Sequence, residues 1–189
     1  MADQEQIRFE ALLCRALAAE KGAAFAFAVL PMEASALLPR RGRMTVDVTL
    51  AAHAFRVTLE PDGRGSHWLR LPESVLEASG NQAGETASFR LQPVDPEPDP
   101  ELPADFAAAL VEIPEARATW AAATPIARVD WIHWITTAKL EKTRAKRIRD
   151  ACGMLASGKK RVCCFDASGI YSKAFSAPVP GPLPPKKRA

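Results

Sequence analysis

The chain has 189 residues, of which 48% are apolar and 25% charged, and its 25 lysines and arginines exceed its 22 acids by three. These proportions are typical of a globular protein with one domain or two small ones. No stretch approaches the roughly 18–20 unbroken apolar residues that span a bilayer, and residues 1–10 carry three acids, so the sequence predicts neither a membrane span nor a secretion signal. Four cysteines without regular spacing favour a reduced, cytoplasmic setting.

Charge is divided unevenly along the chain. Residues 1–127 carry 11 basic and 18 acidic side chains, whereas residues 128–161 carry 10 basic and three acidic ones. Residues 162–189 add four basic side chains and one acid. The basic back part therefore indicates either an anionic partner or contact with the acidic front part.

The front part favours short β-strands. Alternation is clearest at 44–50, where Met44, Val46, Val48 and Leu50 share one face. The other predicted strands are 7–17, 24–30, 53–59, 67–71 and 86–94. About six strands in so short a segment favour a small closed barrel over an open sheet. We expect an α+β protein, with a small closed β-barrel domain at 5–95 that includes two short helices, followed by a compact helical module.

A weak internal repeat lies inside the predicted barrel. Leu30-Pro31 precedes a predicted short helix at 32–38, Leu71-Pro72 precedes another at 73–79, and a glycine follows each helix. Proline suits the first helical turn, where its missing N–H has no partner, and glycine suits the exit. The repeat suggests a barrel with approximate internal two-fold symmetry, although chance occurrence of a common dipeptide is an equal alternative.

The segment 96–103 is an acidic, proline-rich linker, because alternating prolines and acids form neither a helix nor a central strand. Beyond it, helical patterns occur at 104–111, 114–123, 126–139 and 141–157. They predict a helical module at 104–160, a short strand or loop extension at 161–176, and a disordered, basic, proline-rich tail at 177–189.

The third predicted helix is rich in tryptophan. Trp131, Ile135 and Ala138 lie on one stripe, with Trp134 nearby, so the two tryptophans are candidates for core packing or, alternatively, for stacking on a ligand. His133 has no partner in sequence, and we expect it to face solvent or to form a hydrogen bond.

The last predicted helix is strongly basic. Its apolar stripe is Ala145, Ile148, Cys152 and Leu155. The candidate contacts for a partner or anion are Lys142, Lys146, Arg147, Arg149, Lys159, Lys160 and Arg161, with Arg144 as an eighth cation. Such a run is commonly a solvated face, but it also suits nucleic acid, a phosphate-bearing ligand or an anionic surface.

Signals for catalysis or cofactors are weak. Cys163 and Cys164 follow three cations, which favour a reactive thiolate, yet 162–165 also suits a short buried strand. The sequence contains no nucleophile elbow, phosphate loop, zinc-protease or dinucleotide motif. We therefore expect no enzyme, catalytic residue, cofactor or metal site, with redox sensitivity of Cys163 and Cys164 as the residual alternative.

From Arg128 to Lys159 the chain resembles the YdeI/OmpD-associated family, also called bacteriocin-protection proteins. The matching pieces are Trp134-Ile135, Ala138-Lys139, Thr143-Arg144, Arg147-Ile148, Met154-Leu155-Ala156 and Gly158-Lys159. The front part is similar to a small β-barrel domain of unknown function fused ahead of this module, through Phe9-Glu10-Ala11, the two Leu-Pro units and Gly84-Glu85. Lys142 stands where the family is expected to have an acid.

The resemblance covers about residues 7–160. It implies a bacterial accessory protein linked to envelope stress and to resistance to bacteriocins or cationic peptides, with no known reaction. We expect a non-enzymatic interaction protein with a protein partner or an anionic surface. A nucleic-acid-binding or regulatory protein that contacts phosphates through the basic helix is the alternative.

Overall fold

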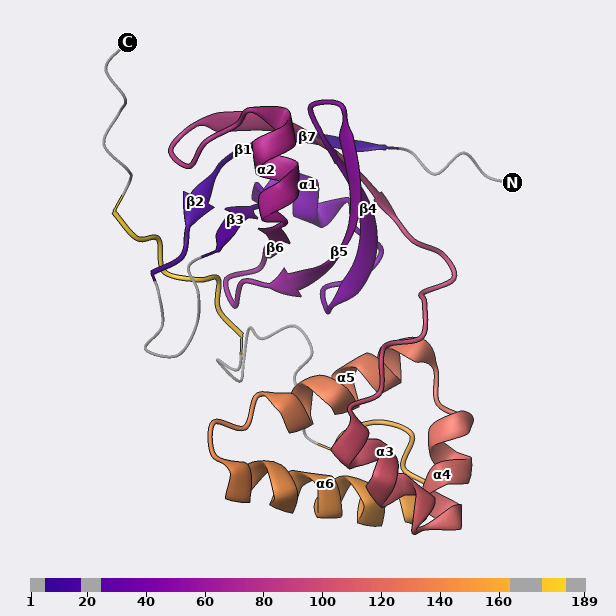
Figure 1. The fold of residues 1–189 in the computed structure, drawn as a ribbon. Coiled ribbons are helices and arrows are strands. Elements are labelled where there is room, and N and C mark those ends of the chain that lie inside the picture. Colours follow the sequence, from indigo (N-terminus) through magenta and orange to yellow (C-terminus); the bar gives the residue numbers. More distant parts are fainter. Residues whose placement is uncertain (1–5, 18–24, 164–174, 183–189) are drawn as a thin grey trace. The chain divides into compact units, whose positions relative to one another are not determined.

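The computed structural model describes residues 6–17, 25–163 and 175–182, and the chain divides into two units (Figure 1). The barrel unit comprises Met1–Asp95 with Asp166–Ala189, and the helical unit comprises Pro96–Phe165. Each unit has its own cluster of buried hydrophobic side chains. The α+β class predicted from the sequence is confirmed.

The described residues of the barrel unit form an antiparallel sheet of seven strands. They are β1 (Ile7–Leu12), β2 (Cys14–Arg15), β3 (Ala26–Val29), β4 (Met44–Leu50), β5 (His53–Pro61), β6 (His67–Leu71) and β7 (Thr86–Pro93), paired in the order β1-β7-β4-β5-β6-β3-β2. The two ends of this order, β1 and β2, are separated in sequence only by Leu13. The sheet therefore curls until its ends meet along one stretch of chain, as in a barrel (Figure 1).

The predicted strand 7–17 is divided at Leu13 because the chain changes partner there. The Leu13 N–H donates to the Glu85 carbonyl at 2.9 Å, and its carbonyl accepts from the Gly84 N–H at 2.7 Å. Before Leu13 the chain pairs with β7, and after it with β3.

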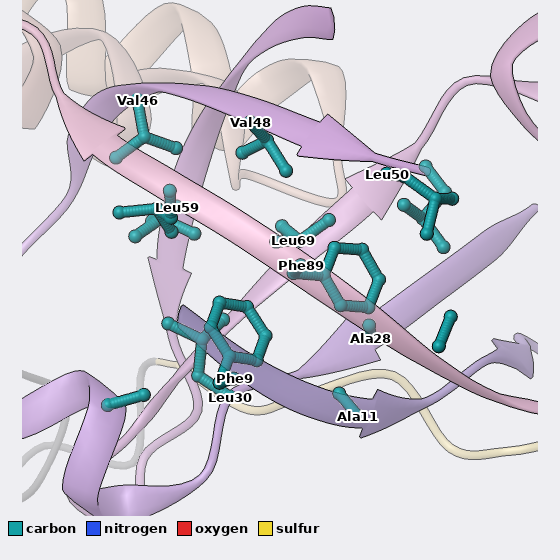
Figure 2. Close-up of a cluster of buried hydrophobic side chains, with 14 of the residues drawn as sticks. Phe9, Ala11, Ala28, Leu30, Val46, Val48, Leu50, Leu59, Leu69 and Phe89 are labelled. Carbon is teal, nitrogen blue, oxygen red and sulfur yellow. The ribbon is translucent and has the colours of Figure 1, made fainter. Parts of the chain in front are cut away.

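The barrel interior is filled by alternate residues of its strands, as period-two patterning requires. In β4 the predicted face of Met44, Val46, Val48 and Leu50 is at most 1% exposed. Figure 2 shows Val46, Val48 and Leu50 among side chains from neighbouring strands, such as Phe89. The rings of Phe9 and Phe89 stack at 5.1 Å.

Strand register supports the internal repeat suggested by the sequence. The β3–β6 pairing includes Ala28 opposite Leu69, and the β4–β7 pairing includes Thr49 opposite Arg90. Both pairs are separated by 41 residues, which is also the spacing of the two Leu-Pro units. The remaining pairings correspond when β1 and β2 are matched to β5 with an offset of 46 residues, as from Arg8 to Ala54, so β5 is the equivalent of β1 and β2 in the second half.

Each half carries one short helix after its proline. Helix α1 (Met32–Ala36) follows Pro31, and α2 (Glu73–Ser79) follows Pro72. The glycine exit holds only for α2, which ends at Gly80 in the left-handed conformation (φ 71°), whereas α1 ends at Leu37 in the right-handed helical region.

Helix α1 is tied to the sheet by a buried polar pair. Ser35 and His67 are each 1% exposed, and the Ser35 Oγ lies 2.8 Å from His67 Nδ1. His67 Nε2 lies 3.3 Å from the Gly42 carbonyl oxygen. Since a carbonyl only accepts, Nε2 carries the ring hydrogen and Nδ1 accepts from the Ser35 hydroxyl. Burial is the main cause that lowers the His67 pKa.

The helical unit consists of α3 (Ala104–Val111), α4 (Pro114–Ala121), α5 (Pro125–Thr136) and α6 (Glu141–Ala156). Prolines occupy the first turns of α4 and α5, where a backbone N–H would have no hydrogen-bond partner within the helix. Phe106 of α3 meets Trp120 of α4 edge to face, with ring centroids 5.2 Å apart, and both pack on buried side chains of α6. In the predicted linker, Asp99 accepts a hydrogen bond from Arg128 of α5 at 2.7 Å.

The start of the predicted tail is held against the barrel. Leu17 N–H donates to the Val179 carbonyl at 2.9 Å, Gly181 N–H donates to the Arg15 carbonyl at 2.7 Å, and Pro180 forms a β-bridge with Ala16. The segment 175–182 thus pairs with the edge of β2 that is not bonded to β3. The remaining predicted tail, 183–189, lies outside the described residues.

Candidate interaction surface of the helical unit

Helix α5 places its two tryptophans differently. Its N-cap is Thr124, whose side-chain oxygen accepts from the Ala127 N–H at 3.3 Å. Trp131 is 0% exposed, and its indole N–H donates to the Lys160 carbonyl at 3.2 Å. Trp134 is half-buried and meets Trp131 edge to face at 6.2 Å. Trp131 thereby ties the segment after α6 to the core.

Two polar residues of α5 are buried. His133 and Asp130 are each 6% exposed, and both make interactions. His133 therefore does not face solvent. Asp130 was not singled out by sequence reasoning, although its position three residues after buried Ala127 places it on the inner stripe of the helix.

The predicted apolar stripe of α6 is largely right but shifted. Ile148, Cys152 and Leu155 are buried together with Ala151, whereas Ala145 is exposed. Burial raises the pKa of the Cys152 thiol.

Three cations of α6 interact with other groups of the helical unit. Arg144 binds Asp105 of α3 through two hydrogen bonds of 2.6 and 2.9 Å, which lower the Asp105 pKa. Lys146 pairs with Asp150 one turn along at 2.7 Å. Arg147 donates to the Trp134 carbonyl and to Thr137 Oγ1, and its guanidinium lies 5.5 Å from the Trp134 ring centroid.

The other candidate cations are exposed, and none makes an ion pair within the described part of the chain. We call these the cationic surface: Lys142, Arg149, Lys159, Lys160 and Arg161. Gly158 follows the end of α6 and has the left-handed conformation (φ 82°). The Gly158 N–H donates to the Leu155 carbonyl at 2.8 Å, and the Lys159 N–H donates to the Met154 carbonyl at 3.1 Å. This helix-ending motif places three cations directly after the negative end of the helix dipole.

The predicted strand at 162–165 is absent from its described part. Val162 is buried in the helical core without strand pairing, and Cys163 is an exposed turn residue. Cys164 lies outside the described residues. The side chain of Val162 is needed in the core, so its apolar character was mistaken for strand character.

Within 6–17, 25–163 and 175–182, His, Cys, Asp and Glu form no group of three or more that could hold a metal ion. No helix in that part of the chain is both long and apolar enough to cross a membrane.

Comparison with known families accounts for most of both units. Residues 9–91 match the model described as Domain of unknown function (DUF1905), and residues 99–158 match the model described as Bacteriocin-protection, YdeI or OmpD-Associated. No curated protein matches the chain. The two matches agree with the boundary between the barrel and helical units. The chain therefore joins a barrel of the DUF1905 family to a helical unit of the YdeI/OmpD-associated family.

Proposed function

We propose that the protein is a cytoplasmic, non-enzymatic accessory protein in bacteriocin protection, and that it acts by binding an anionic partner through the cationic surface. The observation that carries this proposal is the division of the basic residues into two sets. Arg144, Lys146 and Arg147 are engaged within the helical unit. The five residues of the cationic surface are exposed and without ion pairs in the described part of the chain.

Unpaired, solvated cations favour association with an anion, because binding replaces counterions and long-range attraction guides encounter. The family supplies the biological context, since its description names bacteriocin protection. A protein partner with an acidic patch is the partner we infer. A nucleic acid is the alternative that the same charges attract.

A complementation assay tests the proposal. Cells that lack the gene would receive the wild type or a variant in which Arg149, Lys159, Lys160 and Arg161 are changed to Gln, and would be challenged with a bacteriocin. We expect the wild type to protect and the variant to fail. The matched control changes Arg117 and Lys139 to Gln, which are exposed cations of the same unit outside the surface, and it should protect normally. Protection by the four-residue variant at wild-type level would refute the proposal.

A salt titration separates the protein partner from nucleic acid. A protein that neutralises several phosphates of a DNA duplex loses affinity steeply with salt, with a slope of about −0.9 per phosphate contacted on logarithmic axes. If the purified wild type binds a duplex with such a slope, and the four-residue variant loses it, nucleic acid replaces protein as the proposed partner.

A further inference from the structure

The outer face of the barrel holds two arginines in direct opposition. Arg8 of β1 is the cross-strand partner of Arg90 of β7, and both are exposed. Opposite side chains on paired strands have Cβ atoms about 4.5–5.5 Å apart, and like charges there destabilise the pairing. In the described residues, neither arginine makes an ion pair that would relieve the repulsion.

The two arginines line a surface hollow of about 490 Å³. Thr49, the neighbour of Arg90 on β4, lies on the other side, and Ala51 forms part of the rim. Glu10 also lines the hollow and accepts a hydrogen bond from Ser88 at 3.3 Å. The hollow thus combines two guanidinium groups with hydroxyls and one carboxylate.

The internal repeat shows that the barrel does not need these arginines. The repeat relates the β1–β7 pairing to the β5–β4 pairing, in which Ala54 and Thr49 correspond to Arg8 and Arg90. The pair that corresponds to Glu10 and Ser88 is Arg56 and Asp47, which neutralise each other through hydrogen bonds of 2.7 and 2.9 Å. The positions equivalent to Arg8 and Arg90 therefore carry no charge, and the neighbouring Arg56 is neutralised by Asp47.

We propose that Arg8 and Arg90 bind a small phosphate monoester. Guanidinium groups match phosphate oxygens through paired N–H donors, and a dianion between them converts the repulsion into attraction. The Thr49 hydroxyl can donate to a phosphate oxygen, and Glu10 can accept from a hydroxyl of the attached group. The hollow is larger than phosphate alone requires. This site lies on the barrel and does not depend on the function proposed for the helical unit.

The test uses the full chain, with glycerol 3-phosphate as the probe and titration calorimetry as the measurement. The test variant is Arg8→Ala with Arg90→Thr, which copies the residues of the other half and should preserve the fold. We expect its affinity to fall at least about tenfold, since both charged hydrogen-bond donors to the phosphate are lost. Arg90→Thr alone should give a smaller loss. The control Arg56→Gln removes the same charge from the same sheet and should stay within about twofold.

Thermal unfolding checks the fold, and the midpoint of the double variant should equal or exceed that of the wild type because like charges no longer oppose each other. Three results would overturn the proposal. They are no binding of glycerol 3-phosphate by the wild type at millimolar concentration, equal weakening by Arg56→Gln, and binding only to phosphatidylglycerol vesicles, which would assign the arginines to a membrane surface.

Discussion

Ala51 has an unusual backbone conformation for its residue type. It occupies the two-residue turn between β4 and β5 with φ of 52°, and no other described non-glycine residue has a positive φ. The left-handed region costs an L-residue about 1–2 kcal/mol, and glycine avoids most of this cost. We predict that Ala51→Gly raises the free energy of unfolding by about 0.5–1 kcal/mol in urea titrations. Ala54→Gly, on the neighbouring strand, should lower it, and equal effects would contradict the argument.

His67 makes the barrel sensitive to mild acid. Its pKa is lowered chiefly by burial, so the unfolded chain takes up this proton at a higher pH than the folded chain does. The contribution of neutral His67 to the free energy of unfolding is therefore fully present above about pH 6.5, the ordinary histidine pKa. It falls as the pH drops below that value, by up to about 1.4 kcal/mol per pH unit. Asp47 and Asp105, whose pKa values are lowered by arginines, lose their contributions only in stronger acid.

Urea unfolding at pH 7.5 and 5.5 measures this loss. The matched variant His67→Gln should show a smaller difference between the two pH values. If the variant does not fold, NMR titration of the His67 ring in the wild type measures the pKa directly. A His67 pKa at or above the ordinary value would show that burial does not control it.

The residues that sequence reasoning placed well are those whose role follows from a local pattern. The inner face of β4 was predictable because its alternation is unbroken and one face is buried. The burial of His133 and Asp130 was not predictable, because a helical pattern of apolar residues does not by itself show that a polar residue is buried. The hydrogen bond between Ser35 and His67 joins residues 32 positions apart and leaves no local signal.

At the scale of elements, Arg147 fastens α6 to the end of α5. It donates to the Trp134 carbonyl and to Thr137 Oγ1, and it stacks on the Trp134 ring. We predict that Arg147→Ala lowers the free energy of unfolding of the helical unit by about 1–2 kcal/mol. Arg149→Ala removes an exposed arginine of the same helix and should change it by less than about 0.5 kcal/mol. Equal losses of unfolding free energy in the two variants would mean that the positive charge, and not the contacts of Arg147, stabilises the unit.

The segment 175–182 protects the edge of β2. Its two backbone hydrogen bonds fix Leu17 and Arg15, and an uncovered edge strand exposes pairing groups to solvent and to other chains. Deleting residues 175–189 should therefore speed hydrogen exchange of the Leu17 amide by about tenfold or more. Deleting only 183–189 leaves both bonds in place and should not change that rate. Unchanged exchange in the longer deletion would show that the segment does not protect the edge.

Element boundaries were predictable where proline or glycine sets them. Helix α3 occupies the predicted residues, directly after Pro103, and α2 ends at Gly80 as expected. The edge pairing of 175–182 was not predictable, because it joins residues more than 160 positions apart and its prolines suggested disorder. The break at Leu13 was missed for a similar reason, since it depends on Gly84 and Glu85.

At the scale of the whole molecule, the barrel unit is made of two stretches of chain that flank the helical unit. The family matches fall on either side of the same boundary. The internal repeat was visible in the sequence only as two Leu-Pro units, because the equivalent strands differ in their outward residues, such as Arg8 and Ala54. Register, and not residue identity, preserves the symmetry.

Separate buried clusters in the two units predict separate unfolding transitions. Ser35→Ala leaves a buried imidazole nitrogen without its donor and should destabilise the barrel by about 1–3 kcal/mol, which lowers the midpoint of its transition by about 4–8 °C per kcal/mol. Arg147→Ala should lower only the midpoint of the helical unit. Hydrogen exchange measured by mass spectrometry along a temperature series follows both units in one sample. If either variant lowers both midpoints equally, the two cores unfold as one cooperative unit and the division fails.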